Sequence, residues 1–251
     1  MNADALPLFL RTLGLTTIAR EHEAAIAQAE TDNWGYRRFL RHLVETESNA
    51  RLARRIERLL KESALPAHET LDALDPAKFA PQPRRLLPTL RSGEFVRRGE
   101  ALCAFGLPGT GKSAYVCALC RDLVEQHQLK VLFLPAYKLV TRLLVAKRDL
   151  QLPAALAKLN HFDAVIVDDI SYITQTIEEN DVLFAFFAER YERQKSVIVT
   201  SNLVYSQWDQ IFKNAMTAAA IVDRLVHRGT QLEFDGESFR ARAAKDRKRQ
   251  S

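Results

Sequence analysis

The sequence predicts a three-layer α/β domain built on a parallel sheet, preceded by a small all-helical domain. From about residue 100, short apolar runs rich in β-branched residues alternate with helical stretches, which is typical of parallel strands joined by crossover helices. Between Leu6 and Ser63, apolar residues instead recur every three or four positions, and proline and glycine are almost absent. That spacing predicts helices.

The chain has the composition of a globular protein with one substantial core. It has 251 residues, of which 47% are hydrophobic, enough for one main domain and a small extension. No apolar stretch approaches the ~18 residues that cross a bilayer, and residues 1–15 lack the pattern of a secretory signal. We therefore expect a soluble, cytoplasmic protein with no membrane partner.

Four segments are expected along the chain. Residues 1–65 form the helical domain, and residues 66–98 form a linker rich in proline and arginine. Residues 99–238 form the α/β core, and residues 239–251 form a basic tail. Within the core, the apolar runs predict strands at 101–106, 130–136, 163–169, 196–201 and 231–234. The stretches between them predict helices at 112–126, 137–148, 178–194 and 214–227.

A glycine-rich loop follows the first predicted strand and opens the first helix of the core. Its sequence fits the phosphate-binding consensus of P-loop proteins, with Gly106, Pro108, Gly109, Thr110, Gly111, Lys112 and Ser113. Glycines let successive N–H groups turn toward phosphates, and the helix N-terminus adds partial positive charge. We expect Lys112 to reach the β- and γ-phosphates of ATP and Ser113 to ligate Mg²⁺. A chance match in a strand-to-helix turn is the alternative.

Two adjacent acids, Asp168 and Asp169, end the third predicted strand. A P-loop hydrolase needs a carboxylate at the end of a buried strand to hold its metal shell. We expect Asp168 to orient Mg²⁺ and Asp169 to orient the attacking water or accept its proton. A helix cap is the simpler alternative. Asn202, after the next strand, is a candidate sensor of the γ-phosphate, although asparagine also caps turns.

Basic residues are concentrated in a few segments and indicate a polyanionic partner. The formal net charge is +5, and arginines cluster on the long predicted helix and in the linker. The expected DNA contacts are Arg51, Arg54, Arg55, Arg58, Arg84 and Arg85. Solvated charge is the alternative. The three cysteines are odd in number, and we expect Cys103, Cys117 and Cys120 to be small packing residues rather than a metal or redox site.

Several motifs together resemble the IstB-type AAA+ ATPases, the transposition helpers of insertion sequences, which are related to DnaC-type helicase loaders. Besides the P-loop and the two acids, the resemblance rests on short runs distributed over almost the whole chain. They begin at Leu6, Trp34, Arg54, Phe162, Arg190, Thr200 and Asp223, together with Trp208.

The resemblance implies an ATPase that assembles as a homo-oligomer on double-stranded DNA and delivers that DNA to the transposase of the same element. It assigns Asn202 to sensor 1 and Arg224 to an arginine finger that acts on a neighbouring subunit. Arg228 is the alternative finger. The acid at Asp169 is shorter than the glutamate that many AAA+ proteins carry, which predicts slow hydrolysis. The residues after 234 are too few for a C-terminal helical lid.

Other functions fit the same motifs less well. A DnaC-type replicative helicase loader is the main alternative and would use its N-terminal region to bind a helicase. A small-molecule kinase would need an acceptor-binding region and a closing lid, and neither is evident. A DNA-binding scaffold that uses ATP only as an assembly switch would also fit, given the short Asp169.

Overall fold

A computed structural model describes residues 5–75, 79–172, 176–212 and 215–235. Contacts divide the chain into two compact units, Met1–Arg58 and Leu59–Ser251. The boundary lies before the end at residue 65 that the sequence predicted for the helical domain. The expected basic tail, residues 239–251, lies outside the described residues.

The first unit is helical, as predicted. It contains α1 (Leu6–Thr12), α2 (Thr16–Thr31) and most of α3 (Tyr36–Ser63), which continues into the second unit. Its buried apolar side chains include Ile18, Ala19 and Ala25. Many large apolar side chains stay exposed, namely Leu6, Leu8, Phe9, Leu13, Tyr36, Leu40 and Val44. The unit therefore leaves much of its apolar surface uncovered.

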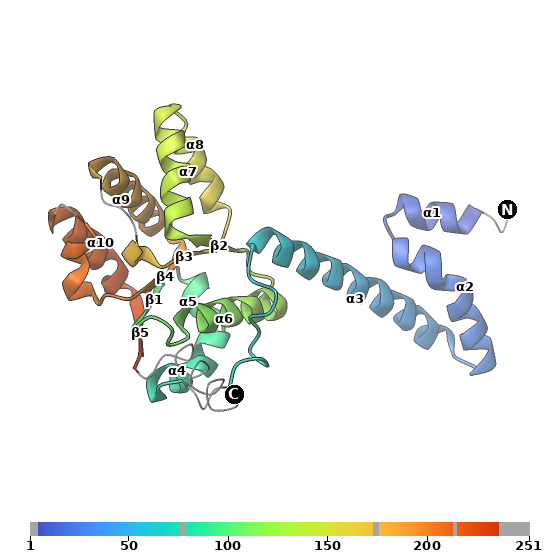
Figure 1. The fold of residues 1–251 in the computed structure, drawn as a ribbon. Coiled ribbons are helices and arrows are strands. Elements are labelled where there is room, and N and C mark those ends of the chain that lie inside the picture. Colours follow the sequence, from blue (N-terminus) through green and yellow to red (C-terminus); the bar gives the residue numbers. More distant parts are fainter. Residues whose placement is uncertain (1–4, 76–78, 173–175, 213–214, 236–251) are drawn as a thin grey trace, which may run out of the picture. The chain divides into compact units, whose positions relative to one another are not determined.

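The second unit contains a five-stranded, wholly parallel sheet of order β2-β3-β4-β1-β5 (Figure 1). The strands are β1 (Ala101–Gly106), β2 (Val131–Pro135), β3 (Ala164–Asp168), β4 (Ser196–Ser201) and β5 (Gly229–Phe234). Each predicted strand is present, with ends shifted by at most two residues. The three central strands β1, β3 and β4 are almost completely buried, because helices cover both faces of the sheet.

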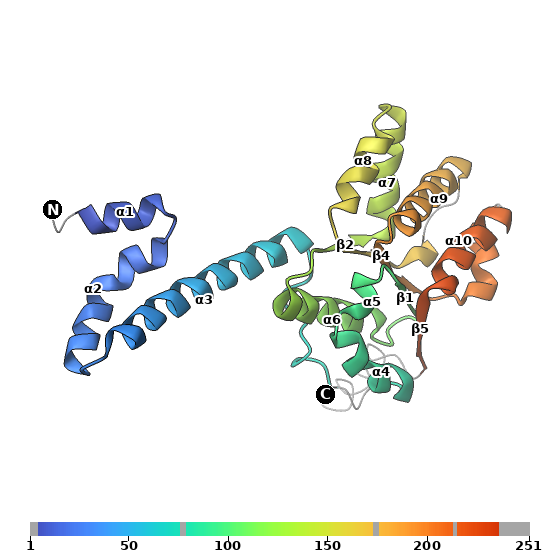
Figure 2. The ribbon, with the colours of Figure 1, turned by 180° about the vertical axis from the view of Figure 1, so that it is seen from behind.

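Alternate residues of β1 belong to different halves of the core. Cys103 and Phe105 pack with α7 (Ala136–Arg148), α9 (Ile177–Glu192) and α10 (Ala215–His227). Leu102 and Ala104 pack with the helices of the opposite face, α4 (Pro81–Arg91), α5 (Glu94–Arg97) and α6 (Lys112–His127). Figure 2 shows these two helix layers from behind. The alternation follows from the two-residue period of a strand.

Helices occupy regions where the sequence predicted none. The expected proline-rich linker contains α4 and α5, and Leu90, Phe95 and Val96 from them are buried in the core. A further helix, α8 (Leu152–Asn160), follows α7. Two short 3-10 helices, η3 (Ile170–Tyr172) and η4 (Tyr205–Gln210), follow β3 and β4.

Candidate nucleotide-binding site

The glycine-rich loop lies between β1 and α6, as the motif required. Gly106 has φ 150°, and a Cβ there would lie 2.3 Å from the carbonyl oxygen of Phe234, so no larger residue fits beside β5. Gly111 caps α6 with φ 88°, in the left-handed region that glycine adopts at little cost. The loop therefore aims the N-terminus of a sixteen-residue helix, with its partial positive charge, at the end of the sheet.

Lys112 is the cation at the centre of the loop. Its side chain is buried, and its ammonium donates hydrogen bonds to the carbonyl oxygens of Gly106 (2.7 Å) and Leu107 (2.9 Å). It also donates to the side-chain oxygen of Asn202, 2.8 Å away. These contacts hold the ammonium between the loop and the end of β4. A phosphate group seated in the loop would meet it directly.

Ser113 and Asp168 come together at the first turn of α6. The Ser113 hydroxyl donates to Asp168 Oδ1 at 2.6 Å. Both atoms are hard oxygen donors of the kind that Mg²⁺ prefers, and both lie beside the loop that would hold the phosphates. This donor set fits a magnesium ion shared between protein and nucleotide. Hydrophobic β3 supplies the rigid base, because Ala164–Val167 are fully buried.

Asp169 has an unusual backbone conformation. Its φ of 63° lies in the left-handed region, which is uncommon for residues other than glycine. Its N–H donates to the hydroxyl of Thr200 at 2.8 Å, and its carboxylate accepts from Asn202 Nδ2 at 3.3 Å. The chain therefore turns sharply after Asp168, and the second carboxylate faces the tip of β4 rather than the Ser113 side. The Asp168 carboxylate thus contacts Ser113, whereas the Asp169 carboxylate contacts Asn202.

Thr200 is a member of this cluster that sequence reasoning did not assign. It is fully buried, donates to Asp168 Oδ1 at 2.7 Å, and accepts from the Asp169 N–H. A hydroxyl can do both at once, whereas an apolar group of the same size can do neither. Ser171 adds a second link, because its hydroxyl accepts from the backbone N–H of Asn202 at 2.8 Å. The Thr200-Ser201-Asn202 run was the available signal.

Arg224 does not join the cluster. It lines a small cavity with Gly99, Ala101, Lys195 and Val197, at the beginnings of β1 and β4, whereas the candidate site lies at the ends of these strands. β1 has six residues, so the two edges are roughly 20 Å apart. Arg224 therefore lies beyond reach of the phosphate loop of the same chain.

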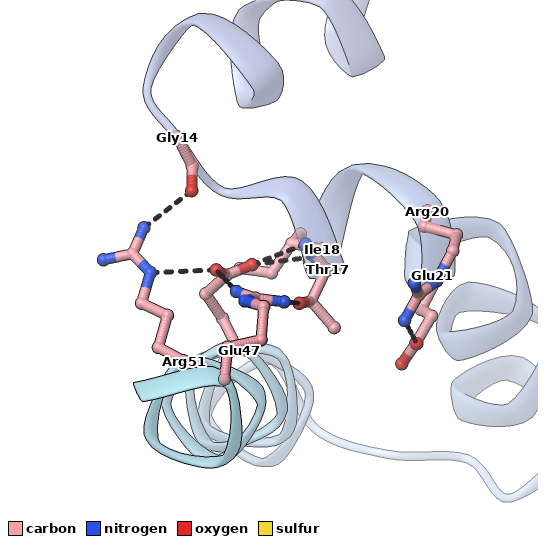
Figure 3. Close-up of polar contacts among 8 residues, drawn as sticks. Gly14, Thr17, Ile18, Arg20, Glu21, Glu47 and Arg51 are labelled. Carbon is pink, nitrogen blue, oxygen red and sulfur yellow. Dashed lines mark hydrogen bonds and ion pairs between the residues drawn. The ribbon is translucent and has the colours of Figure 1, made fainter. Parts of the chain in front are cut away.

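Two of the expected DNA contacts, Arg51 and Arg54, donate to one buried carboxylate, that of Glu47. Figure 3 shows Arg51 and Glu47 in contact. Glu47 is 3% exposed, and it accepts from Arg51 Nε at 2.9 Å and Arg54 at 3.4 Å. It also accepts from the N–H groups of Thr17 and Ile18, which begin α2. Burial alone would raise the pKa of Glu47, but these hydrogen bonds and the nearby Arg51 charge outweigh it and lower the pKa. The two arginines keep about half of their side-chain surface exposed.

The other expected DNA contacts are exposed. Arg55 and Arg58 lie on α3, and Arg84 and Arg85 lie on α4. Within the described residues, Arg55, Arg84 and Arg85 form no ion pair with a carboxylate. Arg91, at the end of α4, differs because it makes a two-pronged ion pair with Asp122 on α6.

The cysteines pack in the core, as predicted. All three are free and buried. Burial raises the pKa of the Cys103 thiol to about 12, and it raises the pKa of Cys117 and Cys120 as well. Thiols with such pKa values are almost entirely protonated at neutral pH, so they act as small apolar groups.

Among the described helices, none has the length and apolar character to span a bilayer.

Comparison with known proteins supports the resemblance. Residues 9–247 match the family model described as IstB-like ATP binding protein. An insertion sequence ATP-binding protein of Sinorhizobium fredii is 37% identical over 246 residues, covering 97% of this chain and 82% of the relative. The insertion sequence IS21 ATP-binding protein of Pseudomonas aeruginosa is 34% identical, covering 94% of this chain and 88% of the relative.

Solved structures share the fold. The DnaC helicase loader matches with a TM-score of 0.55 at 21% identity, covering 67% of this chain and 98% of that one. DnaI matches with a TM-score of 0.57 at 18% identity, covering 68% and 95%. At these identities the likeness is one of fold, and it confirms the predicted α/β core of the P-loop type.

Proposed function

We propose, because this chain belongs to the family of IstB-like ATP-binding proteins, that it is the ATP-dependent DNA-binding helper of an insertion-sequence transposase. In this function it binds ATP, assembles as an oligomer on duplex DNA, hydrolyses ATP and delivers the DNA to the transposase. The observation that carries the ATP-dependent part is the cluster of Lys112, Ser113, Asp168, Asp169 and Asn202 around one loop.

The binding step uses the loop and its lysine. The N–H groups of the loop and the α6 N-terminus would surround the β-phosphate, and Lys112 would exchange its carbonyl partners for β- and γ-phosphate oxygens. Ser113 and Asp168 would hold Mg²⁺, which supplies positive charge against the phosphate oxygens when it is bound. Their 2.6 Å contact supports this assignment, since both oxygens already lie on the same side of the loop.

The hydrolytic step uses the second acid. A water attacks the γ-phosphorus, the bond from phosphorus to the bridging oxygen breaks, and ADP leaves with that oxygen. Asp169 would orient the water and accept its proton, and Asn202 would contact the γ-phosphate from the tip of β4. Since Asn202 contacts both Lys112 and Asp169, it is well situated to link phosphate binding to the position of the acid.

Duplex DNA is the polyanion that the arginines would bind. Arginines on α3 and α4 would contact backbone phosphates and release counterions, and the described residues contain no evident base-reading module. The binding should therefore tolerate most sequences. The slow hydrolysis expected from Asp169 would leave the ATP-bound assembly on DNA long enough to recruit a transposase.

ATP turnover with and without duplex DNA is the experiment that tests this function. We expect turnover to rise when duplex DNA is added and to vanish in Lys112→Ala protein. A transposase of the same insertion sequence should then bind the DNA only when this protein and ATP are both present. Turnover that ignores DNA, or recruitment of a replicative helicase in place of the transposase, would contradict the proposal and favour the loader.

A further inference from the structure

Tyr191, near the end of α9, contacts three polar side chains in the last turn of α10 and directly after it. Its ring centroid lies 6.0 Å from the guanidinium carbon of Arg224 and 5.8 Å from that of Arg228. Its hydroxyl lies 3.2 Å from Nδ1 of His227, and the two rings meet edge to face. The side chain of Tyr191 therefore contacts Arg224, His227 and Arg228 at once.

Arg224 has a second aromatic neighbour. The ring of Phe184, also on α9, lies 5.1 Å from its guanidinium carbon. One N–H of Arg224 donates to the carbonyl oxygen of Ala220 at 2.7 Å. Within the described residues, neither Arg224 nor Arg228 forms an ion pair, so aromatic faces take the place of a carboxylate. Such faces attract a guanidinium without neutralising its charge.

This arrangement suits a cation that must be presented to another molecule. A carboxylate partner would compete with an incoming phosphate for the guanidinium, whereas an aromatic face leaves the N–H groups that do not donate to Ala220 available to a phosphate. Arg224 is also at the edge of the sheet opposite to its own nucleotide loop, so its phosphate would have to come from elsewhere.

We propose that Tyr191 is a positioning residue that holds Arg224 for the nucleotide of a neighbouring subunit. This inference rests on the proposed assembly and ATPase function. The ring fixes the direction of the guanidinium, and the edge-to-face contact with the His227 ring helps to hold the Tyr191 ring in place. Tyr191 would thus contribute to the nucleotide site of the neighbouring subunit, although it lies far from the nucleotide site of its own subunit.

The test compares Tyr191→Leu, which removes the ring, with Tyr191→Phe, which keeps it. With ATP and duplex DNA, we expect Tyr191→Leu to lower turnover about tenfold and Tyr191→Phe to stay within about twofold of the unchanged protein. Nucleotide affinity and assembly, followed by titration and sedimentation, should change in neither variant. Phe184→Leu, which removes the other ring beneath Arg224, should lower turnover in the same way and serves if Tyr191→Leu does not fold.

Mixed assemblies separate a role in the neighbour's site from a structural role. Lys112→Ala protein keeps Tyr191 and Arg224 but cannot use its own nucleotide. Mixing it with Tyr191→Leu protein should restore turnover, as mixing it with Arg224→Ala protein should. If the Arg224→Ala mixture recovers but the Tyr191→Leu mixture does not, Tyr191 acts within its own subunit and this inference is wrong. If Arg224→Ala alone is fully active, Arg224 is not an arginine finger for the neighbouring subunit. The role proposed for Tyr191 is then wrong as well.

Discussion

Lys112 donates a hydrogen bond of 2.8 Å to the side-chain oxygen of Asn202, a residue that lies 90 positions further along the chain. This contact joins the phosphate loop after β1 to the tip of the neighbouring strand β4. It brings an ammonium and a polar amide to the place where we propose that a γ-phosphate lies. The roles that we propose for the residues around this contact can be tested by replacing them one at a time.

Replacing Lys112 with alanine should abolish tight ATP binding. The ammonium is the central cation of the loop, and a buried ammonium facing phosphate contributes far more than an exposed one. Isothermal titration with ATP and Mg²⁺ measures the change. Lys138→Ala, which removes an exposed lysine on α7, is the matched control and should bind normally. If the two variants bind ATP with equal affinity, Lys112 does not contact the nucleotide.

Replacing Asp169 with asparagine should leave ATP binding intact and slow turnover by roughly a hundredfold or more, because general-base catalysis typically contributes that much. Asp168 would still hold the metal, and the amide would keep the shape of the side chain. Titration and a phosphate-release assay report the two effects separately. Normal release from Asp169→Asn would mean that another group activates the water.

Thr200 offers a sharper test of how the acids are held. Thr200→Val removes the hydrogen bond to Asp168 and leaves the half-buried Asp169 N–H without its acceptor, whereas Thr200→Ser keeps both contacts. We expect Thr200→Val to need more Mg²⁺ for half-maximal turnover and to have a lower kcat, and Thr200→Ser to resemble the unchanged protein. The loss of this acceptor should also lower stability, by no more than the cost for a fully buried N–H, which is about 1–3 kcal/mol. If Thr200→Val, Thr200→Ser and the unchanged protein all show the same Mg²⁺ dependence, Thr200 does not help Asp168 to hold the metal.

The sequence predicted the parts of this site that a short motif encodes. The loop and the two acids were found because each follows an apolar strand at a fixed spacing. Thr200 was missed because its partners depend on how β3 aligns with β4, where Val167 pairs with Val199 and the next residues face each other. The spacing of residues along one strand does not show which residue of the neighbouring strand lies opposite.

The errors in the fold have a different cause. Prolines suggested an irregular linker, yet Pro81 and Pro83 lie in the first turn of α4, where their missing N–H groups break no helical bond. Pro153, the second residue of α8, lies in the first turn of its helix in the same way. The role of Glu47 was also hidden. Its contact with Arg51 follows from a four-residue spacing, but its contacts with Thr17 and Ile18 depend on how α2 packs on α3.

Glu47 should make the first unit sensitive to acid. Its pKa is below the ordinary value of 4.5, so the folded state holds its proton more weakly than the unfolded chain does. The stabilisation is complete above the ordinary value and is lost as the pH falls through the lowered one. Helix content followed by circular dichroism should fall over that range, and Glu47→Gln should remove this part of the pH dependence. An unchanged acid transition in Glu47→Gln would show that other groups control it.

Arg55 gives the cleanest test of DNA contact on α3. Arg51 and Arg54 also hold Glu47, so their removal would change both the fold and the charge, whereas Arg55 is exposed and forms no ion pair within the described residues. We expect Arg55→Ala to weaken binding to all duplexes about equally and to reduce the slope of log affinity against log salt by about one.

The control is Arg148→Ala. Arg148 is an exposed arginine at the end of α7 that pairs with Asp149, so this variant removes the same charge from another helix and should leave the slope unchanged. Fluorescence anisotropy at several salt concentrations measures both slopes. If Arg55→Ala and Arg148→Ala give the same slope as the unchanged protein, the α3 arginines do not contact the DNA backbone, and Arg84 and Arg85 on α4 become the residues to replace.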